Sequence, residues 1–404
     1  MYSISFDNVP SSVYKHEKRL VEAYWVNPKE ADDIVVGSRR GIFHKTKDGF
    51  EKTLDKQCLA LRYDGKDLYA ATNNGIYVFE DQKWKSVALE GLFINALSVN
   101  KGRLLASVDK KELVLLDTKT FKVMSNTRVL ISEEELQHDI KLSRFVRDLH
   151  YGRGLFDGIS SLLINDYGAI VLTLLSISGY IIYYLIKTKK HVLWSRRLIK
   201  IHANIFAVIA IFPFLILLIT GIFLDHPKVL APFMRSVNIP HVILPPVYGS
   251  LQEDIWSVDL EDEIYRVGNR YGVYESSDLI NWDMVSKGFA YRMKRLDETL
   301  YISGMGAANR IFREGEWKIL PKTPHMFKDV NTLKEEKEFL SHKSKMQLPK
   351  PEGATLYSIL LALHDGTFFA TWWVWINDVA AILLLVLGLT GTIRYLKKKK
   401  LILK

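Results

Sequence analysis

Four histidines at the ends of long apolar segments are the residues of this sequence best suited to chemistry. His150 and His364 stand in two Leu-His-x-Gly motifs, each of which precedes an apolar segment, and His202 and His226 lie at the two ends of a third. A neutral imidazole is a common protein ligand of haem iron, and a histidine at a membrane surface needs a partner for its ring nitrogen. The alternative is interfacial anchoring, with each imidazole bonded to water, lipid phosphate or backbone.

The segments that follow the two Leu-His-x-Gly motifs are copies of one pattern. Each continues to Ile-Asn-Asp and then to an apolar run that contains a Gly. Asp166 and Gly179 are separated by 13 residues, as are Asp378 and Gly391. Landmarks repeated at a fixed spacing indicate an internal duplication. In membrane proteins, such repeats can be related by an axis along the membrane normal.

Such an axis would place His150 and His364 opposite each other, with one haem b bound non-covalently between their imidazoles. Gly152 and Gly366 each follow the histidine by two residues. Glycine lets a bulky ring approach the backbone closely. We therefore predict these four residues as a haem site, with interfacial anchoring of the histidines as the alternative.

The repeated carboxylates Asp166 and Asp378 are costly residues inside apolar segments. Carboxylates in such positions face the interior of a bundle and have partners, so we expect a helix cap or an interhelical bond. A proton relay, or a group that orients a ligand histidine, is the alternative. His226, in an Asp-His-Pro sequence, is a further residue of this orienting kind and competes as an outer ligand, with anchoring as its simpler role.

Three apolar segments are long enough to cross a bilayer. Residues 167–186, 201–224 and 366–393 are nearly free of charge, and a hydrocarbon core needs about 20 helical residues. The net charge of +10 includes two clusters of Lys and Arg, at 187–200 and 394–404. Short basic loops stay in the cytoplasm, so the membrane explains the basic composition without a nucleic-acid partner.

This orientation places large segments outside the cytoplasm. The second outer segment follows the span 201–224, whereas residues 1–132 have no signal peptide or anchor ahead of them. We therefore expect a fourth membrane helix, bearing a histidine, before residue 1. The predicted fold class is an α-helical transmembrane bundle, with three visible spans and a fourth at the N-terminus, and β-rich, propeller-like extracytoplasmic domains.

Both outer segments repeat a strand-turn-strand unit. Ile34 to Leu68 is 34 residues, Leu68 to Leu104 is 36, and Ile264 to Leu300 is again 36. Short strands joined by turns with Gly or Asn at this spacing are typical of propeller blades, and the units resemble sensor-type propeller repeats. Five units are visible, so the two segments either complete one ring together or form open β-sheets.

The composition of the segments divides the chain into ten parts. We expect two β-rich outer domains (1–132 and 225–328), two interfacial helix regions (133–160 and 354–366), three transmembrane helices (161–187, 201–224 and 367–396), a basic loop (188–200), a charged linker (329–353) and a basic tail (397–404). Cys58 is the only cysteine. A single cysteine excludes an intrachain disulfide, a thiolate metal cluster and covalent c-type haem attachment.

The membrane segments resemble the PepSY-associated transmembrane family. The resemblance rests on the two Leu-His-x-Gly motifs, the Asp inside the following helix, the sequence Leu389-Thr390-Gly391, and an Ile-His span that ends in Thr220-Gly221. It covers roughly 145–226 and 356–400. That family includes inner-membrane haem proteins that act as ferric-siderophore reductases.

This resemblance implies particular roles for three of the histidines. His150 and His364 are implied as outer-face haem ligands, and His202 as an inner-face ligand whose symmetry partner lies on the expected fourth helix. The propeller-like outer domains depart from the PepSY modules usual in the family, which leaves the substrate open.

We therefore predict a haem b protein that transfers electrons across the bacterial inner membrane to an extracytoplasmic acceptor, either a ferric complex or a redox partner protein. Its large domains lie on the periplasmic side, and as an enzyme it would be a haem-dependent ferric reductase. The alternative is a membrane-anchored propeller that acts as a sensor or assembly protein without a redox cofactor. Because the sequence has no nicotinamide or flavin fingerprint, a cytoplasmic or quinone donor would have to dock separately.

Overall fold

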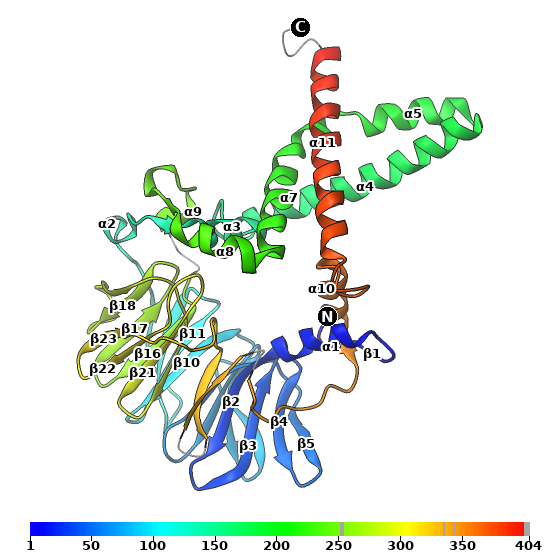
Figure 1. The fold of residues 1–404 in the computed structure, drawn as a ribbon. Helices are drawn as coiled ribbons and strands as arrows, with labels where there is room; N and C mark the ends of the chain where they lie inside the picture. Colours follow the sequence, from blue (N-terminus) through cyan, green and yellow to red (C-terminus); the bar gives the residue numbers. More distant parts are fainter. Residues whose placement is uncertain (251–253, 334–335, 342–343, 400–404) are drawn as a thin grey trace. The chain divides into compact units, whose positions relative to one another are not determined.

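The computed structural model describes residues 1–250, 254–333, 336–341 and 344–399. These residues form two compact units, each built from two separate segments of the chain (Figure 1). The first unit contains Met1–His138 and Ser250–Phe369, and the second contains Asp139–Gly249 and Ala370–Lys404. The β-rich segments thus gather into one unit, and the long apolar helices into the other.

The first unit contains five antiparallel sheets of four strands each, and the strands of each sheet follow one another in chain order. Sheet by sheet, the strands are β2 (Val21–Asn27), β3 (Glu30–Ser38), β4 (Gly41–Thr46) and β5 (Gly49–Leu54); β6 (Cys58–Tyr63), β7 (Leu68–Thr72), β8 (Gly75–Glu80) and β9 (Lys83–Ala88); β10 (Ile94–Asn100), β11 (Arg103–Val108), β12 (Glu112–Asp117) and β13 (Val123–Arg128); β16 (Ser257–Glu261), β17 (Ile264–Gly268), β18 (Gly272–Ser276) and β19 (Asp283–Lys287); and β20 (Ala290–Leu296), β21 (Thr299–Gly304), β22 (Arg310–Arg313) and β23 (Glu316–Ile319).

The first strands of the sheets pack side by side in a closed ring. β2 packs against β6, β6 against β10, β10 against β16 and β16 against β20. β24 (Asp329–Leu333), which pairs with β25 (Glu336–Leu340) in a sixth sheet, closes the ring by packing against both β20 and β2. The unit is therefore a β-propeller of six sheets (Figure 1). The two outer segments complete one ring together, which decides between the two predicted arrangements.

The sixth sheet corrects the predicted charged linker over 329–353. Its strands carry few apolar residues, but Leu340 is buried in a cluster with Tyr24 and Val36 of the first sheet. Asp329 accepts a hydrogen bond from the backbone N–H of Tyr24 at 2.9 Å. These contacts hold a polar pair of strands in the ring, so β24 and β25 belong to the propeller.

Two features stabilise the other blades. Apolar side chains are buried between neighbouring sheets, and tight hairpins connect the strands within each sheet. Ile76, Leu97 and Leu104 are fully buried in the cluster that joins the second sheet to the third. The hairpin between β8 and β9 turns at Asp81 and Gln82, which have φ values of 51° and 63°. Two consecutive positive φ values match the right-handed twist of the flanking strands.

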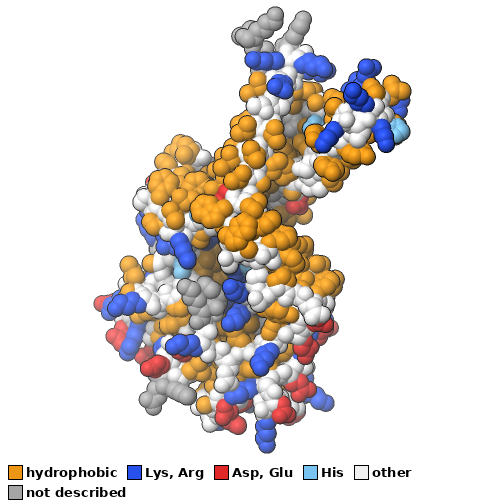
Figure 2. Space-filling view, turned by 45° about the vertical axis from the view of Figure 1, so that its right-hand side comes forward, with side chains coloured by type: hydrophobic (Ala, Val, Ile, Leu, Met, Phe, Trp, Pro, Cys, Tyr) orange, Lys and Arg blue, Asp and Glu red, His pale blue; other side chains and the backbone are white. Residues whose placement is uncertain are grey.

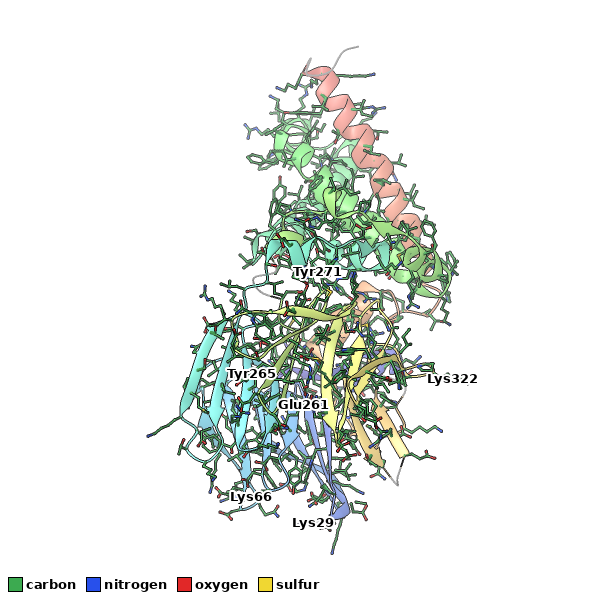
Figure 3. All side chains as sticks on the ribbon, turned by 90° about the vertical axis from the view of Figure 1, so that its left-hand side faces the viewer. Lys29, Lys66, Glu261, Tyr265, Tyr271 and Lys322 are labelled. Carbon is green, nitrogen blue, oxygen red and sulfur yellow. The ribbon has the colours of Figure 1, made fainter. Side chains whose placement is uncertain are left out.

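Polar contacts join the third sheet to the fourth, where the two chain segments meet. The Asn95 side chain donates to the carbonyl of Ile255 at 3.0 Å. Arg103 donates to Glu263 at 3.0 Å and to the hydroxyl of Tyr265 at 3.5 Å. Figure 3 labels Tyr265 in this part of the propeller.

The buried carboxylate of Glu22 forms ion pairs with cationic side chains from three sheets of the ring. Its side chain is 2% exposed and lies 2.8 Å from Arg39, 3.1 Å from Arg292 and 3.1 Å from Lys328. Burial alone raises the pKa of a carboxyl group, but Lys328, Arg292 and Arg39 outweigh it and lower the pKa of Glu22 to about 2. Glu22 is therefore ionised at neutral pH and ties together the first, fifth and sixth sheets.

Several short elements accompany the propeller. β1 (Ser5–Phe6) pairs with β26 (Ala354–Thr355), and α1 (Ser11–Glu17) packs against α10 (Leu356–His364). Glu17 accepts hydrogen bonds from the backbone N–H and the hydroxyl of Thr355, both at 2.7 Å. The helix expected over 354–366 thus contacts the first helix of the chain. The unit also contains η1 (Lys18–Leu20) and α2 (Glu133–Leu136).

The second unit is mostly helical. Its elements are β14 (Ile140–Lys141), α3 (Leu142–His150), α4 (Ser160–Thr188), α5 (Val192–His202), α6 (Ile205–Ile209), α7 (Ile211–Asp225), α8 (Pro227–Ser236), β15 (Asn238–Ile239), η2 (His241–Ile243), α9 (Val247–Ser250), which ends at the unit boundary, and α11 (Val374–Lys398).

Three helical stretches of this unit are long and apolar enough to cross a membrane: Ser160–Thr188, Ile205–Asp225 and Val374–Lys398. They confirm the three predicted spans. Figure 2 shows apolar side chains over the helices and Lys and Arg side chains at the end where the chain terminates. The predicted basic loop over 188–200 is corrected, because most of it forms α5 (Val192–His202).

Candidate cofactor site

An apolar cavity of about 400 Å³ lies within the helical unit. Its walls come from α4, from the turn between α5 and α6, and from α6, α7 and α11. They include Leu175, Ala207, Phe214 and Leu387, and His202 is the one histidine among them. Cofactor and small-molecule sites are mostly apolar pockets of roughly 300–1,000 Å³ with a few placed polar groups, so this cavity has the size and character of a ligand site.

A hydroxyl group on α4 fixes the orientation of His202. Ser178 Oγ lies 2.8 Å from His202 Nδ1, and it donates its own hydrogen to the carbonyl of Leu174 at 2.6 Å. With its hydrogen donated to that carbonyl, Ser178 can accept a hydrogen from Nδ1 of the imidazole. In that tautomer of His202, the lone pair is on Nε2. Metal-binding histidines in proteins are commonly held in this way.

His150 is held by the same arrangement on a different helix. Its Nδ1 lies 3.0 Å from the hydroxyl of Thr220 on α7, which donates its hydrogen to the carbonyl of Ile216. A glycine follows the hydroxyl residue in both cases: a Cβ on Gly179 would lie 3.4 Å from Cε1 of His202, and one on Gly221 would lie 3.7 Å from Cε1 of His150. Each hydroxyl and glycine pair thus binds one edge of an imidazole and leaves room for it.

His364 is the last residue of α10 in the first unit, whereas His150 ends α3 in the second unit. Their pairing across one haem therefore stays a prediction. Close to His364, the buried side chain of His16 lies 3.2 Å from the hydroxyl of Thr367 and 3.5 Å from the carboxylate of Asp365. This neighbour was not apparent from the sequence, because His16 lies 348 residues before His364 in the chain.

Gly152 and Gly366 end the two matching helices with left-handed turns. Their φ values are 61° and 78°, and their N–H groups donate to Leu149 and Leu363, at 3.2 Å and 3.3 Å. Glycine is favoured at such helix ends. A Cβ on Gly152 would lie 2.8 Å from the Cα of Leu162, so the space beside this glycine is filled by the start of α4. Helix termination therefore explains why glycine occurs at both positions, and the sequence prediction did not include this structural role.

The two duplicated carboxylates have different environments. Asp378 on α11 is 8% exposed, and its Oδ2 lies 2.6 Å from Nε2 of His226, whose ring packs 4.6 Å from that of Trp375. Asp166 on α4 is exposed. Its neighbour Asn165 is buried instead and donates to the carbonyls of Leu149 and His150 at 2.9 and 3.1 Å. The predicted interhelical bond thus exists for Asp378.

Asp378→Asn is expected to destabilise the helical unit, and Asp166→Asn is its matched control. Removing the charged partner of a buried group costs about 1–3 kcal/mol, whereas an exposed substitution usually changes stability by about 0.5 kcal/mol or less. Thermal unfolding of the full chain in detergent, followed by tryptophan fluorescence, measures both. Equal melting temperatures for the two variants would contradict a structural role for the pair of Asp378 and His226.

Within the described part of the chain, no three His, Cys, Asp or Glu side chains come together as they would around a bare metal ion.

Residues 70–398 match the sequence profile of a family described as the PepSY-associated TM region. The match runs from β7 through α11 and so includes most of the propeller as well as all three spans. The chain belongs to this family. No curated protein matches it. Family membership supports the membrane location.

Similar solved structures are distant. The extracellular domain of the putative one component system BT4673 from B. thetaiotaomicron is 11% identical, over 78% of this chain and 29% of that one, with a TM-score of 0.35. PorZ, a surface component of the type-IX secretion system of Porphyromonas gingivalis, is 10% identical over 82% and 32%, with a TM-score of 0.39. The designed protein Ika8 is 8% identical over 83% and 88%, with a TM-score of 0.35. The chain spans about a third of the length of the first two.

Proposed function

We propose that this PepSY-associated protein binds haem b in its helical unit and carries electrons across the bacterial inner membrane to an extracytoplasmic acceptor, a ferric complex or a partner protein. The observation that carries the proposal is the position of His202, which lines an apolar cavity and has its Nδ1 2.8 Å from the hydroxyl of Ser178. A neutral imidazole in apolar surroundings is the usual axial ligand of a b-type haem.

The character of the cavity suits haem. Its apolar side chains match the porphyrin ring, and a Cβ on Gly391 would meet nothing within 4 Å, so α11 leaves space beside this residue, whereas at Gly388 it packs closely against Ile211. Lys200 and Arg394 lie close in sequence to the cavity residues His202 and Tyr395. Such cations complement the two carboxylates that a haem carries at one edge.

The protein residues have separate tasks in this proposal. His202 holds the iron through Nε2, and Ser178 keeps the ring in one orientation and makes the imidazole a stronger donor. The apolar walls exclude water, which sets the reduction potential. When bound, haem supplies a reversible one-electron couple. His150 and His364 are the proposed ligands of a second, outer haem, and Thr220 orients His150 as Ser178 orients His202.

The two basic clusters support an orientation with the propeller in the periplasm. The Lys and Arg residues at 187–200 and 394–404 favour the cytoplasmic side for that end of the spans. The opposite ends of α4 and α7 lead into the propeller segments. The acceptor would then meet the protein on the propeller side, and the donor on the basic side.

An absorbance spectrum of the purified full chain tests the proposal. We expect a Soret band and a sharp α-band on reduction, as six-coordinate b-type haem gives. In a His150→Ala/His364→Ala double variant, both bands should lose the part of their intensity that comes from the outer haem. A colourless preparation whose propeller is folded, after growth with added haem precursor, would overturn the proposal. That result would favour a membrane-anchored propeller that acts as a sensor or assembly protein.

A further inference from the structure

A large cavity with mixed polar and apolar walls occupies the centre of the propeller. Its volume is about 1,410 Å³, and residues of all six first strands line it. It extends to Pro28 in the turn between β2 and β3. Figure 3 marks this end of the sheets by Lys29 and Lys66 and the opposite end by Tyr271. We call this cavity the central well.

Four wall residues of the central well occupy equivalent positions in four sheets. Trp25, Arg62, Ser98 and Lys294 pair in register with Val35, Tyr69, Leu105 and Tyr301, the second residues of the repeated strand motif. An indole, two cations and a hydroxyl therefore lie at one level of the well. Closure of the ring does not require different polar side chains at the same position of equivalent blades.

The cations of the central well differ in how their charge is balanced. Lys294 lies 2.7 Å from Asp329, and Arg295 lies 2.7 Å from Asp259. The guanidinium of Arg62 donates instead to two main-chain carbonyls, those of Leu61 and Met293, each at 2.8 Å. In the described part of the chain, no carboxylate lies within ion-pair distance of Arg62.

Arg62 thus keeps donor capacity beyond these two bonds. A guanidinium has five N–H donors in a planar fork, and it loses its charge only at very high pH. Arg62 is partly exposed, and the charges of Asp329 and Asp259 act on it from beyond ion-pair distance, so an anion bound in the well would add a direct counter-charge. Ser98, at the same level, accepts a hydrogen bond from the backbone of Leu260 at 3.0 Å, and its hydroxyl hydrogen can also serve a ligand.

We propose that the central well binds a small oxyanion, a carboxylate or a phosphate, through the fork of Arg62, with Ser98 as a second donor. Both anion types accept the paired N–H groups of an arginine at two oxygens. The proposal does not depend on haem, because all of these residues belong to the propeller. The competing role of Arg62 is structural, since its bond to Met293 ties the second sheet to the fifth.

Isothermal titration of the full chain in detergent with citrate and with inorganic phosphate tests this site. We expect saturable binding of at least one of the two, and a Kd raised tenfold or more in Arg62→Gln. Arg128→Gln is the matched control, because Arg128 is an exposed arginine on the outermost strand β13, with 72% of its side chain accessible. The better ligand of the two identifies the source of the oxyanion.

Several outcomes would overturn the oxyanion site. They are no binding of either anion by the folded wild type, equal affinity in wild type and Arg62→Gln, or an equal loss in Arg128→Gln. If Arg62→Gln does not fold, Arg62→Lys replaces it, because lysine keeps the charge but loses the fork. A Kd unchanged by Arg62→Lys would also contradict recognition by the guanidinium. The haem spectrum of each variant, recorded alongside, keeps this outcome separate from the proposed redox function.

Discussion

His202→Ala is expected to weaken haem binding by at least about 100-fold. Losing only the group that orients a ligand histidine costs about 10- to 100-fold in affinity, and this variant loses the ligand itself. Titration of haem into the purified full chain, followed at the Soret band, measures the effect. His191→Ala is the control. His191 is the N-cap of α5, so it lies on the same helix as His202, but it does not line the cavity. If the Soret absorbance per mole of protein is the same in His202→Ala as in the wild type, His202 is ruled out as a ligand.

A second pair of variants refines this expectation. Ser178→Ala keeps the imidazole of His202 but removes the acceptor of its Nδ1 hydrogen, so we expect a smaller loss of affinity and a shifted midpoint potential. Thr173→Val is matched to it, because Thr173 lies on the same helix and its hydroxyl also donates to the carbonyl four residues earlier, Ala169, at 2.9 Å. Identical potentials for the two variants would contradict the role given to Ser178.

Glu22→Gln is expected to destabilise the propeller by about 3–5 kcal/mol, because breaking a buried ion pair by removing one partner leaves charge uncompensated. Here Arg39, Arg292 and Lys328 all lose the same carboxylate. For a domain of this size, each kcal/mol lowers Tm by about 2–4 °C, so the expected loss is on the order of 10 °C. Circular dichroism of the β signal measures it. Glu80→Gln, which removes an exposed pair with Lys85, should leave Tm nearly unchanged.

The pH dependence of stability follows from the same carboxylate. The pKa of Glu22 falls from an ordinary value of 4.5 to about 2 in the folded protein, so folding favours the ionised form. Its contribution is fully present above about pH 4.5 and is lost as the pH falls towards 2. Wild-type Tm should therefore drop through this window, and Glu22→Gln should show a shallower drop. Parallel curves would contradict the ion-pair account.

The strand repeats allowed much of the propeller to be predicted. The spacing of Ile34, Leu68 and Leu104 reflects blades whose apolar side chains pack between sheets, and such periodicity is visible in sequence. The sixth sheet was not visible, because its two strands bury few apolar side chains and depend on contacts such as that of Asp329 with Lys294. Likewise, the many Lys and Arg residues of α5 hid its helical character.

Fewer features of the candidate site could be predicted. The position of His202 at the end of an apolar segment was informative, because the chemistry of imidazole makes such a residue unusual. Its partner Ser178 is 24 residues away, and the partner of Asp378, His226, is 152 residues away. Such pairs depend on how helices pack, which the local pattern does not encode. The Ser-Gly and Thr-Gly dipeptides of α4 and α7 were a usable signal.

The closed ring also constrains how the protein is made. Its third and fourth sheets lie on either side of α4 and α7 in the chain, yet β10 packs against β16. Both segments must therefore be on the same side of the bilayer, which requires an even number of crossings between them, and Ser160–Thr188 and Ile205–Asp225 supply two. The ring can therefore close only after this helical hairpin has been inserted and the later segment lies on the same side of the bilayer as the first three sheets. A closed propeller thus depends on the correct insertion of the two helices between its third and fourth sheets.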